Sequence, residues 1–174
     1  SREASFLLNN WVFIAILMVI FWGTLFPVFS EALSGRRIAV GPKFFNTMAG
    51  PLALLLLLLT GVGPLIAWRR ATVTSLRRQF VWPTTAGAAT AGVLLSTSAP
   101  VDLYGLAAWS LGCFAMAAIL QDFSRATRAR MRTRNENPFR AIATLLSRNQ
   151  QRYGGYVVHI GAILILMGTA GSVL

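Results

Sequence analysis

The chain has 174 residues, of which 55% are hydrophobic and 12% are charged, with a mean hydropathy of +0.61. This composition excludes an ordinary soluble domain, because the apolar residues occur in runs of about 20, long enough to cross a bilayer. The net charge of +11 does not indicate nucleic-acid binding, because the cations lie in short segments between the apolar runs. The sequence therefore predicts an all-α polytopic transmembrane helix bundle.

Five apolar runs are predicted to cross the membrane and to form one transmembrane region over residues 1–174, part of a longer or split chain. In chain order, the predicted spans are residues 10–29, 45–68, 81–99, 103–123 and 155–174. The third is the weakest, because its Ala, Gly, Thr and Ser suit close helix packing better than contact with lipid. Asn46 is expected to cap the second span.

The distribution of the cations predicts the orientation of the spans. Of the 16 cations, Arg36, Arg37 and Lys43 fall on one side of the five-span arrangement, and the remaining 13 fall on the other. Because arginine-rich loops stay in the cytoplasm, the N-terminus is predicted to be cytoplasmic and the C-terminus external. In a bacterial cytoplasmic membrane, the external side is the periplasm.

The segment before the last span is predicted to form a short interfacial helix over about residues 138–149. Asn137 suits the N-cap position and Pro138 the first helical position. On a helix, Phe139, Ile142, Leu145 and Leu146 share one face. This amphipathic pattern predicts a helix lying on the inner membrane surface, although an arginine-rich loop held by anionic lipid fits the same composition.

The last span carries the only histidine, His159. An ionisable group inside a membrane is costly and is by default a candidate for function. Three interpretations are open: a neutral imidazole bonded to another helix, a proton-relay residue, or an axial ligand of haem iron. The relay is disfavoured because the carboxylates map to loops or span ends, namely Glu3, Glu31, Asp102, Asp122 and Glu136.

Small residues surround the histidine at helical spacing. One turn on either side of His159 stand Gly155 and Ala162, which leaves room for a flat ligand. The opposite side carries small residues that suit a neighbouring backbone, so both sides of this helix are expected to be packed: Gly154, Gly161, Gly168 and Ser172. Arg152 precedes His159 by about 10 Å of helix, so Arg148 and Arg152 are candidates to bind haem propionates.

Several segments resemble the CcmF family, the membrane haem lyase component of bacterial cytochrome c maturation. The resemblance is strongest in SREASFLLNNWVF, FWGTLFPVFSE and RYGGYVVHIGAILILMG, and in the pairing of GPKFFN (Gly41 to Asn46) with GVGP (Gly61 to Pro64). In that family, a membrane-tethered chaperone delivers haem, which is joined covalently to apocytochrome c outside the cytoplasmic membrane. Two membrane histidines hold a resident haem b, and the resemblance places one of them on His159.

The resemblance implies further partners and also shows what is missing. It implies the remainder of the haem lyase, thiol-handling subunits that prepare apocytochrome c, and quinol as the reductant of haem b. The family's tryptophan-rich external segment, its external haem-binding histidines and its other haem-b histidine have no counterpart in the sequence. The second axial ligand is therefore expected outside this chain. No catalytic residue is assigned, and the chain alone is not expected to attach haem to apocytochrome c. A transporter module or a structural anchor with a structural histidine is the alternative.

Overall fold

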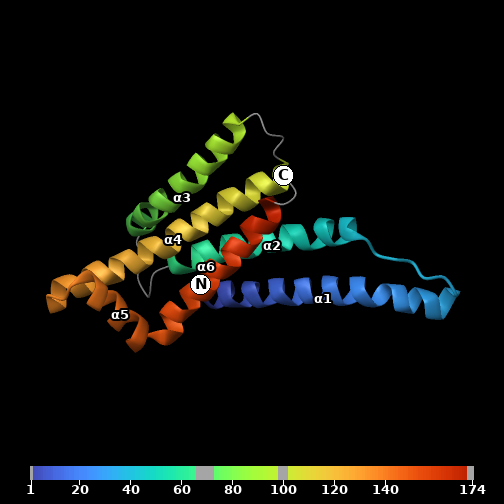
Figure 1. Ribbon diagram of the computed structural model, residues 1–174, viewed down its shortest axis with the longest axis horizontal. Coiled ribbons are helices and arrows are strands. Elements are labelled where there is room, and N and C mark those ends of the chain that lie inside the picture. Colours follow the sequence, from blue (N-terminus) through green and yellow to red (C-terminus); the bar gives the residue numbers. More distant parts are fainter. Residues whose placement is uncertain (1, 66–72, 98–101, 172–174) are drawn as a thin grey trace. The chain divides into compact units, whose positions relative to one another are not determined.

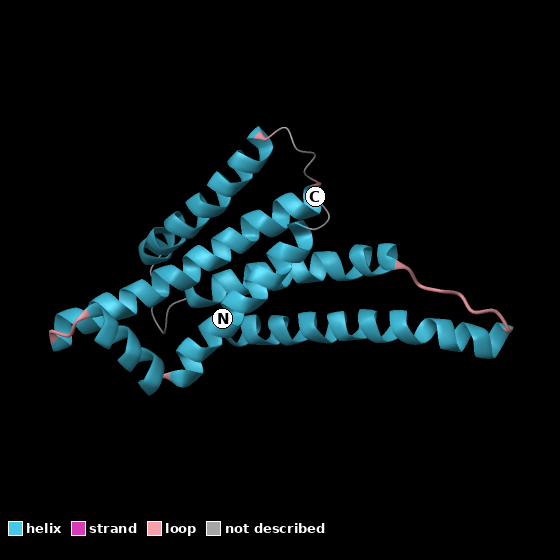
Figure 2. Cartoon of the chain, viewed as in Figure 1, coloured by secondary structure: helices cyan, strands magenta, loops and turns pink. Residues whose placement is uncertain are grey.

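The computed structural model describes residues 2–65, 73–97 and 102–171. These residues form helices joined by short loops, as Figure 2 shows, so the predicted all-α class is confirmed. In chain order, the described helices are α1 (Arg2–Ser34), α2 (Pro42–Leu65), α3 (Val73–Ser96), α4 (Leu103–Arg134), α5 (Pro138–Arg148) and α6 (Gln150–Gly171). The predicted span ends at 66–68, 98–99 and 172–174 lie outside the described residues, as do Arg69, Arg70 and Ser172.

Within the described residues, four helices are long and apolar enough to cross a membrane, namely α1, α2, α4 and α6. The predicted third span overlaps α3, a helix of 24 residues that begins eight residues before the predicted span and falls outside this set. Its polar residues, including Arg77 and Arg78 in its first half, lower its hydropathy. A fifth span and the orientation derived from it therefore stay predictions.

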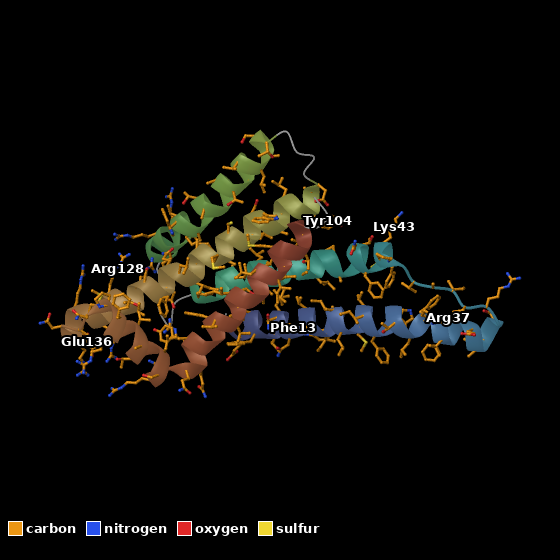
Figure 3. All side chains as sticks on the ribbon, viewed as in Figure 1. Phe13, Arg37, Lys43, Tyr104, Arg128 and Glu136 are labelled. Carbon is orange, nitrogen blue, oxygen red and sulfur yellow. The ribbon has the colours of Figure 1, made fainter. Side chains whose placement is uncertain are left out.

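The helices extend beyond the apolar runs that predicted them. The fourth span was predicted to end at residue 123, but α4 continues without a break to Arg134. At 32 residues it is about 48 Å long, against about 30 Å for the hydrocarbon layer. The arginines that follow its apolar run therefore lie on a helix rather than in a loop, as Figure 3 shows for Arg128.

The start of α2 corrects another expectation. The helix begins at Pro42, a favoured first helical residue, so Asn46 lies in its second turn and does not cap it. By contrast, Asp102 caps α4 as its residue type favours, because its carboxylate accepts a hydrogen bond of 2.7 Å from the Gly105 amide.

The chain divides into two compact units, residues 1–59 and 60–174. In the first unit, Gly23 of α1 lies directly against the rings of Phe44 and Phe45 at the start of α2. Most large side chains of α1 are exposed, including Trp11 and Trp22. Exposed apolar side chains on a helix of this length are typical of contact with lipid or with further membrane helices.

In the second unit, α4 packs against α3, α5 and α6, and Figure 1 shows it running between α3 and α6. A buried cluster of Leu65, Phe114 and Ala118 joins the end of α2 to α4, and Phe80 of α3 packs onto it. Glycines permit the close approaches. A Cβ at Gly87 of α3 would lie 2.9 Å from the Ser110 carbonyl oxygen, and one at Gly112 would lie 2.5 Å from Met167 Sδ of α6.

A tight turn connects α4 to α5. Asn135 ends α4 in the left-handed conformation, at φ 50°. Arg130 Nε donates a 2.7 Å hydrogen bond to Glu136, and this contact lowers the pKa of Glu136. Asn137 occupies the predicted N-cap position without a side-chain cap bond, and Pro138 begins α5 as expected. Figure 3 shows Glu136 at this turn.

The apolar face predicted for α5 is divided between two environments. Ala141 and Leu145 are buried where α5 contacts α4 and α6, whereas Phe139 is 86% exposed and Leu146 is also exposed. The helix is therefore confirmed, and of its four predicted apolar residues only Leu145 is buried within this chain. Its contact with the membrane surface stays a prediction.

The left-handed residue of this turn yields a stability prediction. Asn135→Val is expected to destabilise the protein by about 1–2 kcal/mol, because a β-branched side chain disfavours this backbone conformation. Asn135→Gly is expected to leave stability unchanged or slightly higher, because glycine adopts it freely. Thermal unfolding in detergent measures both variants. Equal midpoints for the valine and glycine variants would contradict the assignment of strain to this residue.

Candidate functional site

His159 lies in the second turn of the apolar part of α6, and its side chain is exposed on the surface of this chain. Within the part of the chain that the structure describes, no hydrogen bond, ion pair or ring contact to it is recorded. A histidine with a structural role within this chain would contact a polar group of the chain. The imidazole nitrogens are therefore available to a ligand or to a chain outside this one.

The surroundings of His159 leave space on its own helix. A Cβ added to Gly155, one turn earlier, would meet no atom within 4 Å. Ala162, one turn later, is exposed. The small residues predicted beside the imidazole are thus open, as a planar macrocycle approaching the histidine requires.

The packed face of α6 is different from the one expected. Tyr153, Ile163 and Met167 are buried and form the side turned towards α4. At about 100° per residue, His159 lies about 80° around the helix from Met167, beside this seam rather than in it. The opposite glycines are open: an added Cβ would meet nothing within 4 Å at Gly154, Gly161 or Gly168. The expectation that both sides are packed is wrong for this chain.

A polar network joins α4 to α6 on the N-terminal side of His159. Arg152 Nη2 donates a 2.8 Å hydrogen bond to Asp122 Oδ2, and the Tyr156 hydroxyl donates one of 2.5 Å to the same oxygen. Arg152 Nε also lies 3.5 Å from the Tyr156 hydroxyl oxygen. The three groups form a charge-assisted cluster, which is stronger than neutral hydrogen bonds of the same number.

Aromatic rings surround this network. The ring of Tyr153 meets Phe123 edge to face, with centroids 5.5 Å apart, and meets Tyr156 edge to face at 5.8 Å. The Arg152 guanidinium lies 5.8 Å from the centre of the Tyr153 ring. Such contacts have preferred geometries, so they add direction to the join between the two helices.

Sequence reasoning missed Asp122 and Tyr156. It placed Asp122 at the end of the predicted span 103–123 and gave it no role, whereas in α4 its side chain is only 18% exposed and is paired with α6. The available signal was the pairing of a carboxylate near the end of one apolar run with an arginine at the start of the next. Two antiparallel helices joined by a compact connection bring such positions together.

The two arginines proposed for propionates have different environments. Arg152 is already paired with Asp122, whereas Arg148 is exposed on a shallow hollow lined by residues 147–152. For Arg148, no ion pair is recorded within the described ranges. The described residues also contain no group of three or more His, Cys, Asp or Glu side chains that would hold a bare metal ion.

Known proteins similar to this chain are cytochrome c biogenesis proteins. The CcmF protein of Pseudomonas fluorescens is 29% identical over 99% of this chain, and the CycK protein of Bradyrhizobium diazoefficiens is 29% identical over 73% of it. The CcmF protein of Pseudomonas aeruginosa reaches 44% identity over 40% of this chain. These matches cover 25%, 19% and 10% of the respective relatives, so the chain spans about a quarter of their length at most.

No protein-family model and no solved structure matches the chain. The match to the Pseudomonas fluorescens protein includes α6, because it leaves almost none of this chain unaligned. The aligned part of this chain therefore includes the helix with the histidine and the segment of α4 that carries Asp122. The chain is a homologue of the CcmF and CycK cytochrome c-type biogenesis proteins over nearly all of its own length and over a portion of theirs.

Proposed function

We propose that this chain is a membrane component of cytochrome c maturation in which His159 is an axial ligand of a resident haem b. The observation that carries the proposal is the exposed imidazole of His159, without a partner among the described residues, on an apolar helix of a chain homologous to CcmF. A neutral imidazole is a common axial ligand of haem iron. The second axial ligand comes from another part of the haem lyase.

The residues around His159 fit the cofactor. Gly155 and Ala162 leave the imidazole accessible on both sides along the helix, and the exposed guanidinium of Arg148 offers a cation for a propionate. Arg152 is less suited to that role, because Asp122 already neutralises it. When bound, haem b supplies a one-electron redox centre whose potential depends on its ligands and burial.

The chain's own contribution is to hold and orient one ligand in a water-poor environment. α6 presents the imidazole, and its packing on α4 fixes the direction in which His159 points. The proposed partners are the remaining portion of the haem lyase, a haem chaperone, apocytochrome c with its thiol-handling subunits, and quinol. The proposed location is the bacterial cytoplasmic membrane, with a cytoplasmic N-terminus and an external C-terminus.

His159→Ala in the full-length protein that contains this segment is expected to remove most of the b-type haem. The measurement is a pyridine haemochrome assay with redox difference spectra on protein purified in detergent. Val158→Ala is the matched control, because Val158 is the adjacent residue and is also exposed. It is expected to retain haem.

A second variant separates ligand loss from misfolding. His159→Gly is expected to regain a low-spin haem spectrum when imidazole is added, because free imidazole occupies the vacated ligand position. A normal b-type haem content in His159→Ala would overturn the proposal and favour a structural anchor. Flux across liposomes that depends on this chain would favour a transporter instead.

A further inference from the structure

The Asp122 carboxylate is the point at which two side chains of α6 meet one side chain of α4. Arg152 and Tyr156 both donate to the same oxygen, Asp122 Oδ2. These two donors stand one helical turn apart on α6. Two donors one turn apart on α6 that bind the same acceptor restrict the rotation of α6 about its own axis. They also restrict its sliding along α4.

The network lies immediately before His159 on the same helix. Tyr156 is three residues before the histidine and Arg152 is seven, about 4.5 Å and 10 Å along the axis. Around the helix, these donors lie about 60° and 20° from His159. The network therefore restrains the part of α6 that immediately precedes His159. Its two donors lie on nearly the same side of the helix as the imidazole.

Apart from the edge-to-face ring pair of Tyr153 and Phe123, the remaining contacts between α4 and α6 give little directional control. Beyond Tyr153, the buried residues of α6 are Ile163 and Met167, and Met167 lies against Gly112. Aliphatic and thioether contacts are adaptable and have no preferred direction. In a membrane, apolar packing alone also has little driving force, because lipid tails are as apolar as the side chains. Among the described contacts of α6 with α4, the charged hydrogen bonds to Asp122 and the adjoining Tyr153–Phe123 ring pair thus carry the orientation.

We infer that Asp122 is a positioning residue for His159: through Arg152 and Tyr156, it sets the rotation of α6 and so the direction of the imidazole. This inference rests on the proposed role of His159 as a haem ligand. A rotation of α6 by about 20° would move an atom about 6 Å from the axis by about 2 Å. Metal–ligand distances tolerate only about 0.2 Å, so such a rotation would weaken or distort the bond to iron.

Three substitutions in the full-length haem-containing protein test the inference. Asp122→Ala removes the acceptor, Asp122→Asn keeps its shape without the charge, and Tyr156→Phe removes a single hydroxyl group. The matched control is the pair Arg130→Gln and Glu136→Gln. It removes the ion pair between α4 and the following turn and leaves the contacts of α6 intact. The measurements are haem affinity, the midpoint potential and the electron paramagnetic resonance signal of the ferric haem.

Asp122→Ala is expected to lower haem affinity by about 10- to 100-fold, as loss of an orienting partner does at other metal sites. It is also expected to shift the midpoint potential and the g-values, because the angle of the imidazole plane changes. Asp122→Asn and Tyr156→Phe are expected to produce smaller shifts in the same direction. The Arg130 and Glu136 control is expected to leave both readouts unchanged.

The outcomes separate this inference from the function on which it rests. If His159→Ala loses haem but the Asp122 and Tyr156 variants keep the native potential and g-values, Asp122 is not a positioning residue and the proposed function stands. If His159→Ala keeps its haem, both proposals fail. Tyr156→Phe keeps the test decisive if Asp122→Ala does not accumulate, because it removes one oxygen atom and leaves the Arg152–Asp122 pair in place.

Discussion

Replacing Gly87 with leucine is expected to separate α3 from α4 and to reduce the yield of folded protein sharply. A Cβ at Gly87 would lie 2.9 Å from the Ser110 carbonyl oxygen and 3.3 Å from Phe114 Cβ. The first contact is with backbone, which cannot rotate away, so α4 itself would have to move. Overpacking of this kind costs about 1–3 kcal/mol, and more where the backbone blocks relaxation.

Gly92→Leu is the control for this substitution. Gly92 lies on the same helix, and a Cβ there would meet no atom within 4 Å. The change is expected to leave folding intact, because leucine favours helix over glycine and nothing obstructs it. Membrane accumulation and thermal unfolding in detergent measure both variants. Equal losses for Gly87→Leu and Gly92→Leu would contradict a close α3–α4 contact.

A second large effect is expected where α6 crosses α4 at Gly112. A Cβ at Gly112 would lie 2.5 Å from Met167 Sδ and 2.6 Å from Met167 Cγ. Gly112→Ala is therefore expected to destabilise the protein, and Met167→Ala to leave a gap in the seam. In the double variant, the smaller alanine at position 167 makes room for the added methyl group at position 112. The destabilisation of the double variant is therefore expected to be about 0.5–3 kcal/mol smaller than the sum of the two single losses.

A double-mutant cycle based on thermal unfolding in detergent measures this coupling. Gly161→Ala is the control on α6, because a Cβ at Gly161 meets nothing within 4 Å. It is expected to be neutral in this chain and to show no coupling to Met167→Ala. Strict additivity of the Gly112 and Met167 losses would show that the two residues are not in contact.

Hydropathy predicts the helices of this chain well and their ends less well. Each of the six described helices overlaps a predicted span or the predicted interfacial helix. The predicted ends follow the apolar runs, whereas a helix continues wherever its backbone bonds are satisfied and no breaker intervenes. For this reason α4 runs through its arginines and stops only at Asn135, which adopts the left-handed conformation.

The candidate site is predictable only in part, because sequence patterns show single unusual residues but not contacts between distant ones. His159 stands out because it is the only imidazole and lies in an apolar run. Asp122 and Tyr156 do not, because their importance arises from a contact between residues 34 positions apart. The exposed glycine face of α6 was also beyond prediction from spacing alone, since spacing identifies a face but not whether a neighbour covers it.

The unbroken length of α4 has a mechanical consequence. No turn interrupts the helix between Leu103 and Arg134, so it behaves as a stiff lever with α3 and α6 packed along it. A tilt of about 10° about one end would swing the other by about 8 Å. A docking protein or a charged lipid surface that displaces the arginine-rich C-terminal end of α4 would thus also displace α6, the helix that carries His159, because α4 has no hinge between the two.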